Sequence, residues 1–421
     1  MINRSSLIFF LCAALATHSA EAQHGAADFG GHVKSRAEST LYPADSAFRD
    51  AFGRRADDLG LELRLKAAFR QGRWGFAADY QGIALNADSL AHAGDLPGLP
   101  LPALQVIDDR RRWWDLTYTV GDPDGAVVVH RLDRLNVSWT GARTVWRFGR
   151  QAISWGNGLL FNPVDVFNPF DPAAVDTEYK PGDDMLYGQY LFTNGDDLQG
   201  VAVVRRDPLT GDVESGQSSL ALKYHGFVGM NEFDLLAASH YDDTIIAAGG
   251  TLALGGAVAR GDVTWTRTAH ADVFQAVASL GYSWVWGGRN VSGLIELYRN
   301  GFGQPGGAYG LNALAANPDL LARLARGELY TIGRNYAAAS MTIELTPLLR
   351  LTPNLFVNLD DPSALAQVVV QYDWRQNLQL LAALNAPLGA EGSEYGGIEA
   401  PVEGRYLSTR GGLFIQLAAY F

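Results

Sequence analysis

Apolar and polar residues alternate along most of this 421-residue chain, and this alternation restricts its fold more than any other feature. Leu59, Leu61 and Leu63 occupy every second position of one segment, with the charged residues Glu62 and Arg64 close by. Successive side chains of a β-strand point to opposite faces, so the segment is predicted to form a strand with one apolar and one polar face. The same pattern predicts about 18 strands (roughly 16 to 20, because 31–40 and 113–120 are the least regular segments). They lie near residues 31–40, 59–69, 73–84, 127–139, 144–153, 184–192, 198–206, 217–226, 230–240, 245–255, 258–268, 271–286, 290–300, 336–346, 349–359, 364–374, 377–386 and 408–421.

The connections between these strands sort into two sets that alternate along the chain. One set contains only turns of two to five residues, such as 70–72 and 256–257. The other set contains every long connection, namely 41–58, 85–126, 154–183, 207–216, 301–335 and 387–407. Bacterial outer-membrane barrels have short periplasmic turns and long extracellular loops. We therefore predict an all-β, transmembrane, antiparallel up-and-down β-barrel with long extracellular loops and both termini in the periplasm.

The chemistry of the two strand faces agrees with a barrel in a bilayer. Only a closed barrel pairs every backbone polar group while presenting strands to lipid, so the apolar face would contact acyl chains. Tyr282, Trp284 and Trp286 lie on that face just before a short turn, where an interfacial aromatic girdle is expected. Burying the charges of the other face without water would cost several kcal/mol each, so a polar lumen is predicted. That face carries Glu62, Arg64, Lys66, Asp79, Lys223, His225, Asp262, Glu296, Glu344, Gln367, Gln371 and Asp373.

The two ends of the chain favour export to the outer membrane. Residues 1–22 combine Arg4, a short apolar run and a small-x-small cleavage site ending at Ala22, which is typical of a signal peptide. Residues 23–421 would then form one barrel domain, with too few residues before the second strand for a plug. The final alternating strand ends in Phe421, a feature that the outer-membrane assembly machinery recognises. The expected partners are this machinery, the lipid bilayer and lipopolysaccharide, and a homotrimer is compatible with the sequence.

Composition and motifs argue against several other functions. The net charge of −12 disfavours nucleic-acid binding. The only cysteine, Cys12, falls in the predicted signal peptide, so no disulfide or cysteine nucleophile is expected. The sequence lacks Gly-x-Ser-x-Gly, His-Glu-x-x-His, P-loop and Rossmann motifs, and none of His130, His225 and His240 has a serine or acid at a spacing that predicts catalysis. We therefore predict a protein that is not an enzyme and needs no cofactor or metal.

Residues 149–171 are the segment most suggestive of function. They resemble a segment in a family of proteobacterial outer-membrane β-barrel proteins of unassigned function, which pair a Gly-Arg-Gln…Trp-Gly stretch with a downstream Asp-x-x-Asn-Pro. The matching residues are Gly149, Arg150, Gln151, Trp155, Gly156, Asp165, Asn168 and Pro169. The resemblance covers about one tenth of the chain. It implies a porin-like fold and an outer-membrane location, but neither a catalytic residue nor a substrate.

The loop that follows, 154–183, is unusually apolar and is stiffened by Pro163, Pro169 and Pro172. We expect it to fold into the barrel mouth and narrow it, with Asp165, Asp171, Asp176 and Glu178 facing wall arginines in a selectivity filter. In the alternative, Arg150, Gln151 and Asp165 only tie the loop to the wall. The candidate constriction residues are Arg147, Arg150, Gln151, Trp155, Asp165, Asn168 and Asp171.

The loop 301–335 is predicted to contain a short helix at the mouth. Asn317 is a suitable N-cap, Pro318 suits the first turn, and Gly327 follows the apolar face. The function that best fits the whole sequence is a porin-like channel for passive diffusion of small solutes. The alternatives are a structural or export partner of an envelope transport system and, third, an outer-membrane hydrolase.

Overall fold

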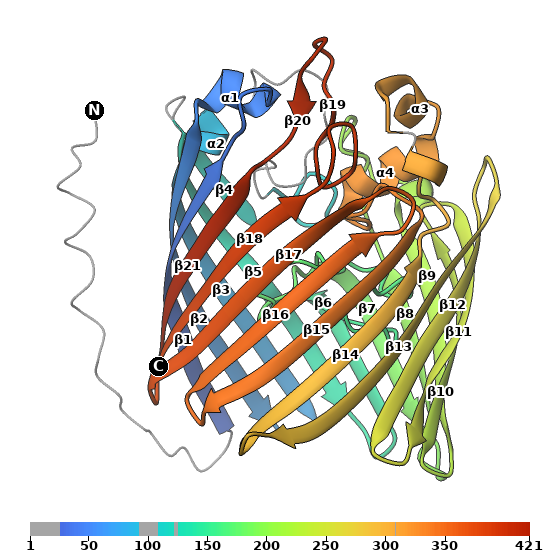
Figure 1. Cartoon of the computed structure of the whole chain (residues 1–421). Coiled ribbons are helices and arrows are strands. Elements are labelled where there is room, and N and C mark those ends of the chain that lie inside the picture. Colours follow the sequence, from blue (N-terminus) through green and yellow to red (C-terminus); the bar gives the residue numbers. More distant parts are fainter. Residues whose placement is uncertain (1–25, 92–107, 122–124, 308) are drawn as a thin grey trace.

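The computed structural model describes residues 26–91, 108–121, 125–307 and 309–421. Eighteen antiparallel strands form a closed barrel (Figure 1). Each strand pairs with its neighbours in chain order, and β21 (Gly411–Tyr420) pairs with β1 (Ala26–Leu41) to close the ring. A nineteenth strand of the sheet, β4 (Thr117–Gly121), pairs with one end of β5 beyond the short strand β6.

The other barrel strands are β2 (Arg55–Gln71), β3 (Trp74–Ala87), β5 (Ala126–Thr140), β6 (Thr144–Gln151), β7 (Asp183–Leu191), β8 (Asp197–Val203), β9 (Ser219–Val228), β10 (Asn231–His240), β11 (Asp243–Leu254), β12 (Ala257–Arg267), β13 (Asp272–Trp286), β14 (Arg289–Arg299), β15 (Asn335–Thr346), β16 (Leu349–Asn358), β17 (Ser363–Arg375) and β18 (Leu378–Leu388). Each of the predicted segments overlaps one of these eighteen strands, so the predicted fold class is confirmed. The predicted signal peptide lies outside the described residues.

The long connections lie at one end of the barrel and carry the remaining elements. These are α1 (Ala47–Phe52), α2 (Asp88–Ala91), α3 (Leu311–Ala315), α4 (Pro318–Arg326) and the hairpin of β19 (Ile398–Glu399) and β20 (Tyr406–Leu407). Helix α4 matches the predicted helix: the side chain of Asn317 accepts a hydrogen bond from the Leu320 N–H, and Gly327 ends the helix in a left-handed conformation. Among the described residues, no helix is long and apolar enough to cross a membrane.

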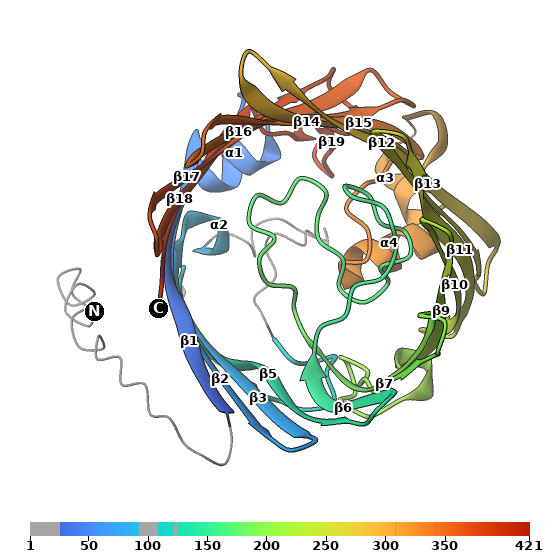
Figure 2. The same cartoon turned by 90° about the horizontal axis from the view of Figure 1, so that it is seen from below.

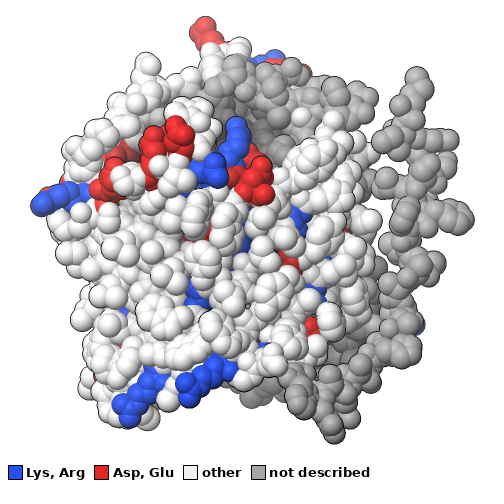
Figure 3. Space-filling model, turned by 180° about the vertical axis from the view of Figure 1, so that it is seen from behind, with Lys and Arg blue, Asp and Glu red and all other residues white. Residues whose placement is uncertain are grey.

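The two faces of the strands differ as the alternation predicts. On β14, Ile295 and Leu297 point outward and are 62% and 55% exposed, whereas Glu296 between them is fully buried toward the interior. Tyr282 and Trp286 at the end of β13 are likewise exposed on the outside. Figure 3 shows charged residues gathered near the upper and lower rims of one side, with a mostly uncharged belt between them. Such a belt between charged rims is the surface expected of a barrel that spans a bilayer.

The barrel seam depends on a glycine opposite the C-terminal residue. The Gly31 N–H donates to the Phe421 carbonyl at 2.8 Å, and the Phe421 N–H donates to the Gly31 carbonyl at 3.1 Å. A Cβ atom on Gly31 would lie 2.2 Å from the Arg64 carbonyl oxygen and 2.8 Å from the Phe421 ring. Only glycine therefore allows the last residue to close against the first strand.

Gly31→Val is expected to weaken the seam, because the added side chain must displace the backbone at residue 64. The expected loss is about 3 kcal/mol of unfolding free energy. Urea titration of the folded protein in detergent, followed by tryptophan fluorescence, measures it. Gly200→Val is the matched control, since a Cβ there meets only Leu222 at an ordinary 3.7 Å. Equal stability of the two variants would contradict this role of Gly31.

Candidate channel constriction

Residues 152–182, here called the inner segment, leave the wall after β6 and run through the interior before joining β7 (Figure 2). Near its start, Gly156 has a φ of 95°. A Cβ there would lie 2.1 Å from the Asn162 side-chain oxygen, so a larger residue would not fit this tight turn. The prediction that this loop folds into the barrel agrees with the structure.

The first half of the inner segment packs on an apolar part of the inner wall. Trp155, Val164 and Phe167 are buried against residues of β7 to β11 such as Val201 and Leu236. The Trp155 indole N–H also donates to the Gln199 side chain at 2.8 Å. The apolar composition of the loop is explained by this contact, which removes its large side chains from water.

Two wall carboxylates bind the backbone of the inner segment. Glu296 accepts hydrogen bonds from the N–H groups of Leu159, Leu160 and Phe161 at 2.9, 3.0 and 2.6 Å. Asp262 on β12 accepts from the N–H groups of Asn157 and Gly158 at 2.6 and 3.1 Å. These five amides have no helix or sheet partner, so the carboxylates supply the acceptors that a buried backbone requires.

An aromatic cluster continues the attachment beyond these carboxylates. The Phe161 ring stacks on Tyr298 of β14 with centroids 4.8 Å apart. It also contacts Tyr336 of β15 and Phe356 of β16. Aromatic pairs at such distances add to the free energy gained by burial, so this part of the inner segment has a fixed position.

The second half of the inner segment crosses to the opposite wall and binds it through charges. Lys34 of β1 contacts the carboxylates of Asp176 and Glu178 at 2.6 and 2.8 Å. Gln416 of β21 donates to Asp176 at 2.9 Å, and Tyr420 donates to Glu178 at 2.9 Å. Burial alone would raise the pKa of both carboxyls, but the hydrogen bonds and the charge of Lys34 outweigh it and hold each pKa below its ordinary value. Both groups are therefore anions at neutral pH.

The aromatic side chain of Tyr179 in the inner segment contacts cations of the same wall. The guanidinium of Arg64 lies 4.1 Å from the centroid of the Tyr179 ring, and Lys66 donates to the Tyr179 hydroxyl at 2.8 Å. Asp133, which is buried at an irregularity in the pairing of β3 and β5, holds Arg64 at 2.7 Å. The inner segment is thus tied to both sides of the barrel, and it divides the interior.

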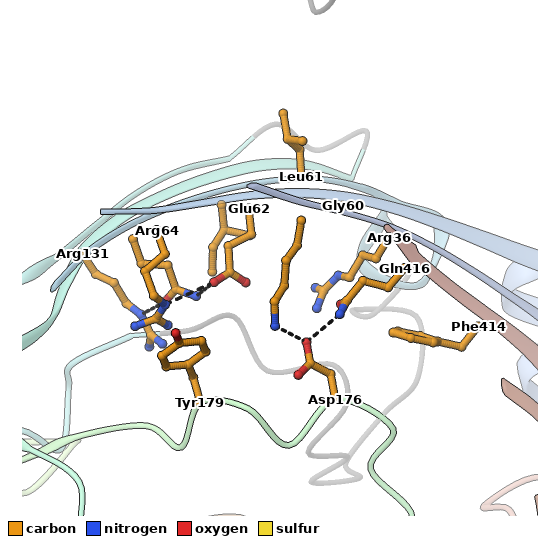
Figure 4. Close-up of a pocket in the computed structure, with 13 residues that line it drawn as sticks. Arg36, Gly60, Leu61, Glu62, Arg64, Arg131, Asp176, Tyr179, Phe414 and Gln416 are labelled. Carbon is orange, nitrogen blue, oxygen red and sulfur yellow. Dashed lines mark hydrogen bonds and ion pairs between the residues drawn. The ribbon is translucent and has the colours of Figure 1, made fainter. Parts of the chain in front are cut away.

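A cavity of about 180 Å³ lies between the inner segment and this wall. Figure 4 shows Asp176 and Tyr179 pointing from the inner segment toward Arg64, Glu62 and the neighbouring strands. The charged and polar side chains that line it are Lys34, Arg36, Glu62, Arg64, Gln81, Arg131, Asp176, Tyr179 and Gln416. Four of these are cations and two are carboxylates, so the residues that line the cavity carry a net positive charge.

Arg150 and Asp165, which we expected to face each other, lie apart with other partners. Arg150 shares a strand face with the outward-pointing Phe148, and its guanidinium contacts Asp184 at 2.9 Å and Asp109 at 2.8 Å. Asp165 instead pairs with Lys180 at 2.5 Å, within the inner segment itself. The strand alternation explains the difference, because it directs Arg150 away from the lumen. Arg150 therefore joins β6 to β7 and to Asp109, while the Asp165–Lys180 pair joins two parts of the inner segment, so neither contact ties the loop to the wall as the alternative expected.

The other predicted residues have mixed positions. Arg147 donates to the Gln151 side chain at 3.2 Å, and Gln151 is almost fully buried in the wall. Asn168 has a φ of 55°, which places a left-handed turn between the two halves of the inner segment. Asp171 is exposed and accepts a hydrogen bond from the Ala173 N–H at 2.8 Å. Asp176 and Glu178 thus face a wall cation, but it is Lys34 and not an arginine as predicted, and Asp171 bonds within its own loop.

Several residues that hold the inner segment were assigned to the lumen face from the alternation. The alternation did not reveal which groups they bind. Asp262 and Glu296 were expected on the lumen face, and the structure shows that they bind backbone amides 105 and 135 positions away in sequence. Lys34 and Tyr179 were not singled out at all. The signal that would have identified Lys34 is its rarity, since it is one of four lysines in the chain.

A serine, a histidine and a carboxylate lie in contact near the mouth. Ser219 is 2.8 Å from His240 Nδ1, and His240 Nε2 is 3.1 Å from Glu328. A serine hydrolase needs an accessible hydroxyl, but Ser219 and His240 are 6% and 2% exposed and Arg205 donates to the serine oxygen at 2.7 Å. The arrangement thus serves to hold elements together. Within the described residues, no three His, Cys, Asp or Glu side chains gather as metal ligands do.

Comparisons with known proteins identify the fold. No family model matches the chain, and no curated protein sequence matches it. Among solved structures, OccAB3 of Acinetobacter baumannii superposes with a TM-score of 0.54 at 10% identity, covering 94% of this chain and 99% of that one. OccK2 (OpdF) of Pseudomonas aeruginosa, solved in complex with glucuronate, gives 0.53 at 10% identity over 94% and 98%. A BenF-like porin from Pseudomonas fluorescens Pf-5 gives 0.52 at 12% identity over 94% and 98%.

Proposed function

We propose that this protein is a channel of the Gram-negative outer membrane through which small anionic solutes diffuse passively, narrowed by the inner segment. A closed barrel with an apolar belt and a charged interior suits an aqueous path across a bilayer. The likeness to solved porins over nearly the whole chain supports this assignment. The short turns would face the periplasm, and Phe421 would serve recognition by the assembly machinery.

The cationic cavity between the inner segment and strands β1, β2, β3, β5 and β21 carries the assignment to anions. Among its four cations, Arg64 and Lys34 each hold carboxylates of the protein. Arg36, in contrast, is exposed and has no hydrogen bond or ion pair with the described residues. It is therefore available to a passing solute. Glucuronate, which is bound in the OccK2 structure, carries one carboxylate and is of the class that we propose here.

Solute flux into proteoliposomes tests this function. Radiolabelled glucuronate and glucose have similar rings and differ in charge, so a cationic path should admit glucuronate several times faster. Arg36→Ala is expected to reduce this preference by about threefold, the effect of one charge several Å from the path at high dielectric. Arg350→Ala, which removes a lumen-facing arginine of β16 on another part of the wall, should reduce it less.

Equal rates for the two solutes in the wild type would contradict the anion preference. No flux of either solute would contradict the channel itself and favour a structural or export role.

A further inference from the structure

Residues 301–307 and 309–334, here called the lid, form a compact cover at the mouth of the barrel. They include α3 and α4, which lie within the outline of the ring at its loop end (Figures 1 and 2). The lid has its own apolar core of Phe302, Leu314, Leu320 and Leu329, and Leu320 is fully buried. This core also packs on Val273 of β13 and Ile398 of β19, which join the lid to its surroundings.

The lid is held to the rim of the barrel by ion pairs and hydrogen bonds. Arg323 of α4 contacts Asp243 at the start of β11 at 2.5 Å. Asp319 accepts a hydrogen bond from Thr268, between β12 and β13, at 2.7 Å. His270 also contacts Asp319 at 2.9 Å. The His270 side chain is largely exposed, so its pair with Asp319 contributes little, whereas Arg323 is buried.

Glu328 makes a deeper contact than the others. Its carboxylate lies 3.1 Å from His240 Nε2 of β10 and 2.7 Å from Arg326 of α4. Burial alone would raise the pKa of Glu328, but His240 and Arg326 outweigh it and hold the pKa far below its ordinary value. The other charged or titratable groups around this point are Arg205, Asp183 and Tyr241. Glu328 is therefore the anion that pairs with Arg326 at this contact, while Asp183 of β7 pairs with Arg205.

His240 joins the lid to the inner segment as well. The Phe167 ring meets the His240 ring edge to face, with centroids 5.6 Å apart. A second link lies close by, since the Tyr330 hydroxyl of the lid donates to the Pro169 carbonyl at 3.1 Å. The lid and the inner segment thus share one contact point on the wall and have a direct bond to each other.

We propose that Glu328 is a latch, which pins the lid to His240 and so keeps the inner segment in its narrow position. This inference rests on the proposed channel function. Without the carboxylate, Arg326 and Arg205 would face each other with less compensation, and the lid would lose its hydrogen bond to the buried His240 of the wall. Removing one partner of a buried charge network is costly because the remaining charges stay buried and unpaired. The lid would then detach intermittently, and Phe167 with it.

Single-channel recording in planar bilayers tests the latch with Glu328→Gln, which keeps the size of the side chain and removes its charge. The variant is expected to switch between the wild-type current and a larger one, with a switching frequency at least tenfold above that of the wild type. Glu403→Gln, in the exposed loop before β20, has no described partner and is the matched control. It should conduct as the wild type does.

A reversible cross-link separates lid motion from misfolding. Thr268→Cys and Asp319→Cys place two thiols where short side chains now touch, in a chain whose only cysteine, Cys12, precedes the barrel. Joining them with a short bifunctional thiol reagent in the Glu328→Gln protein should abolish the extra switching, and a reducible linker should restore it on reduction. Steady wild-type current in Glu328→Gln, or switching that persists after cross-linking, would overturn the latch. A wild-type protein that carries no current would instead overturn the channel proposal.

Discussion

Glu296→Ala is expected to widen the channel and raise its single-channel conductance about twofold or more. The alanine leaves the N–H groups of Leu159, Leu160 and Phe161 without acceptors in a buried site. Each unsatisfied buried donor costs about 1–3 kcal/mol of folding free energy. Three such donors together strongly destabilise the position of this turn against the wall. The turn should therefore leave the wall and seek water, which opens the space it now fills. Conductance in symmetrical potassium chloride measures the change.

Two further variants make the result for Glu296 specific. Glu296→Gln keeps one oxygen acceptor but brings an amide donor toward the same N–H groups, so an intermediate conductance is expected. Glu344→Ala removes a lumen-facing carboxylate of β15 that contacts Asn290 and not the inner segment. It should leave conductance unchanged. A Glu296→Ala protein that is folded and conducts as the wild type would show that the inner segment does not need this anchor.

Lys34→Met is expected to reverse the ion preference of the channel. The substitution removes a cation of the cavity wall and leaves Asp176 and Glu178 without their shared partner. One unit charge within several Å of the path changes the energies of anions and cations in opposite directions, so the anion-to-cation permeability ratio should fall on the order of threefold to tenfold. Reversal potentials across a potassium chloride gradient give this ratio.

The matched control for Lys34 is Lys223→Met. Lys223 of β9 pairs with Asp234 at 3.0 Å on another part of the inner wall and does not contact the inner segment. The Lys223→Met variant removes the same charge from the lumen, but away from the cavity. The anion-to-cation permeability ratio should therefore change far less than in Lys34→Met. If both variants changed the ratio equally, net lumen charge rather than the contact at Lys34 would set the preference.

The strands were predictable because alternation is a local property. Every second residue of a strand reports the environment of one face, so Trp286 and Glu296 were assigned to lipid and lumen without any tertiary information. The parity of loop lengths added the closure of the barrel. Capping also acts locally, and Asn317 and Gly327 fixed the ends of α4 from sequence alone.

The partners across the lumen could not be predicted in the same way. Which carboxylate Lys34 meets depends on where a 31-residue segment crosses a barrel, and no spacing in the sequence encodes that path. The expectation for Arg150 failed for a more specific reason. The charge of Arg150 and its proximity to the loop suggested a lumen position. Arg150 instead lies at the end of a short strand whose outer face is covered by segment 108–116. Its partners Asp109 and Asp184 lie on this outer face.

The most direct test of the account is the current through single molecules of the purified wild-type protein in a planar bilayer under a potassium chloride gradient. The account predicts stepwise insertion of small ohmic conductances, with a reversal potential that shows preference for chloride. Membranes that stay silent after verified insertion of folded protein would contradict the channel, and a reversal potential that shows preference for potassium would contradict the cationic constriction.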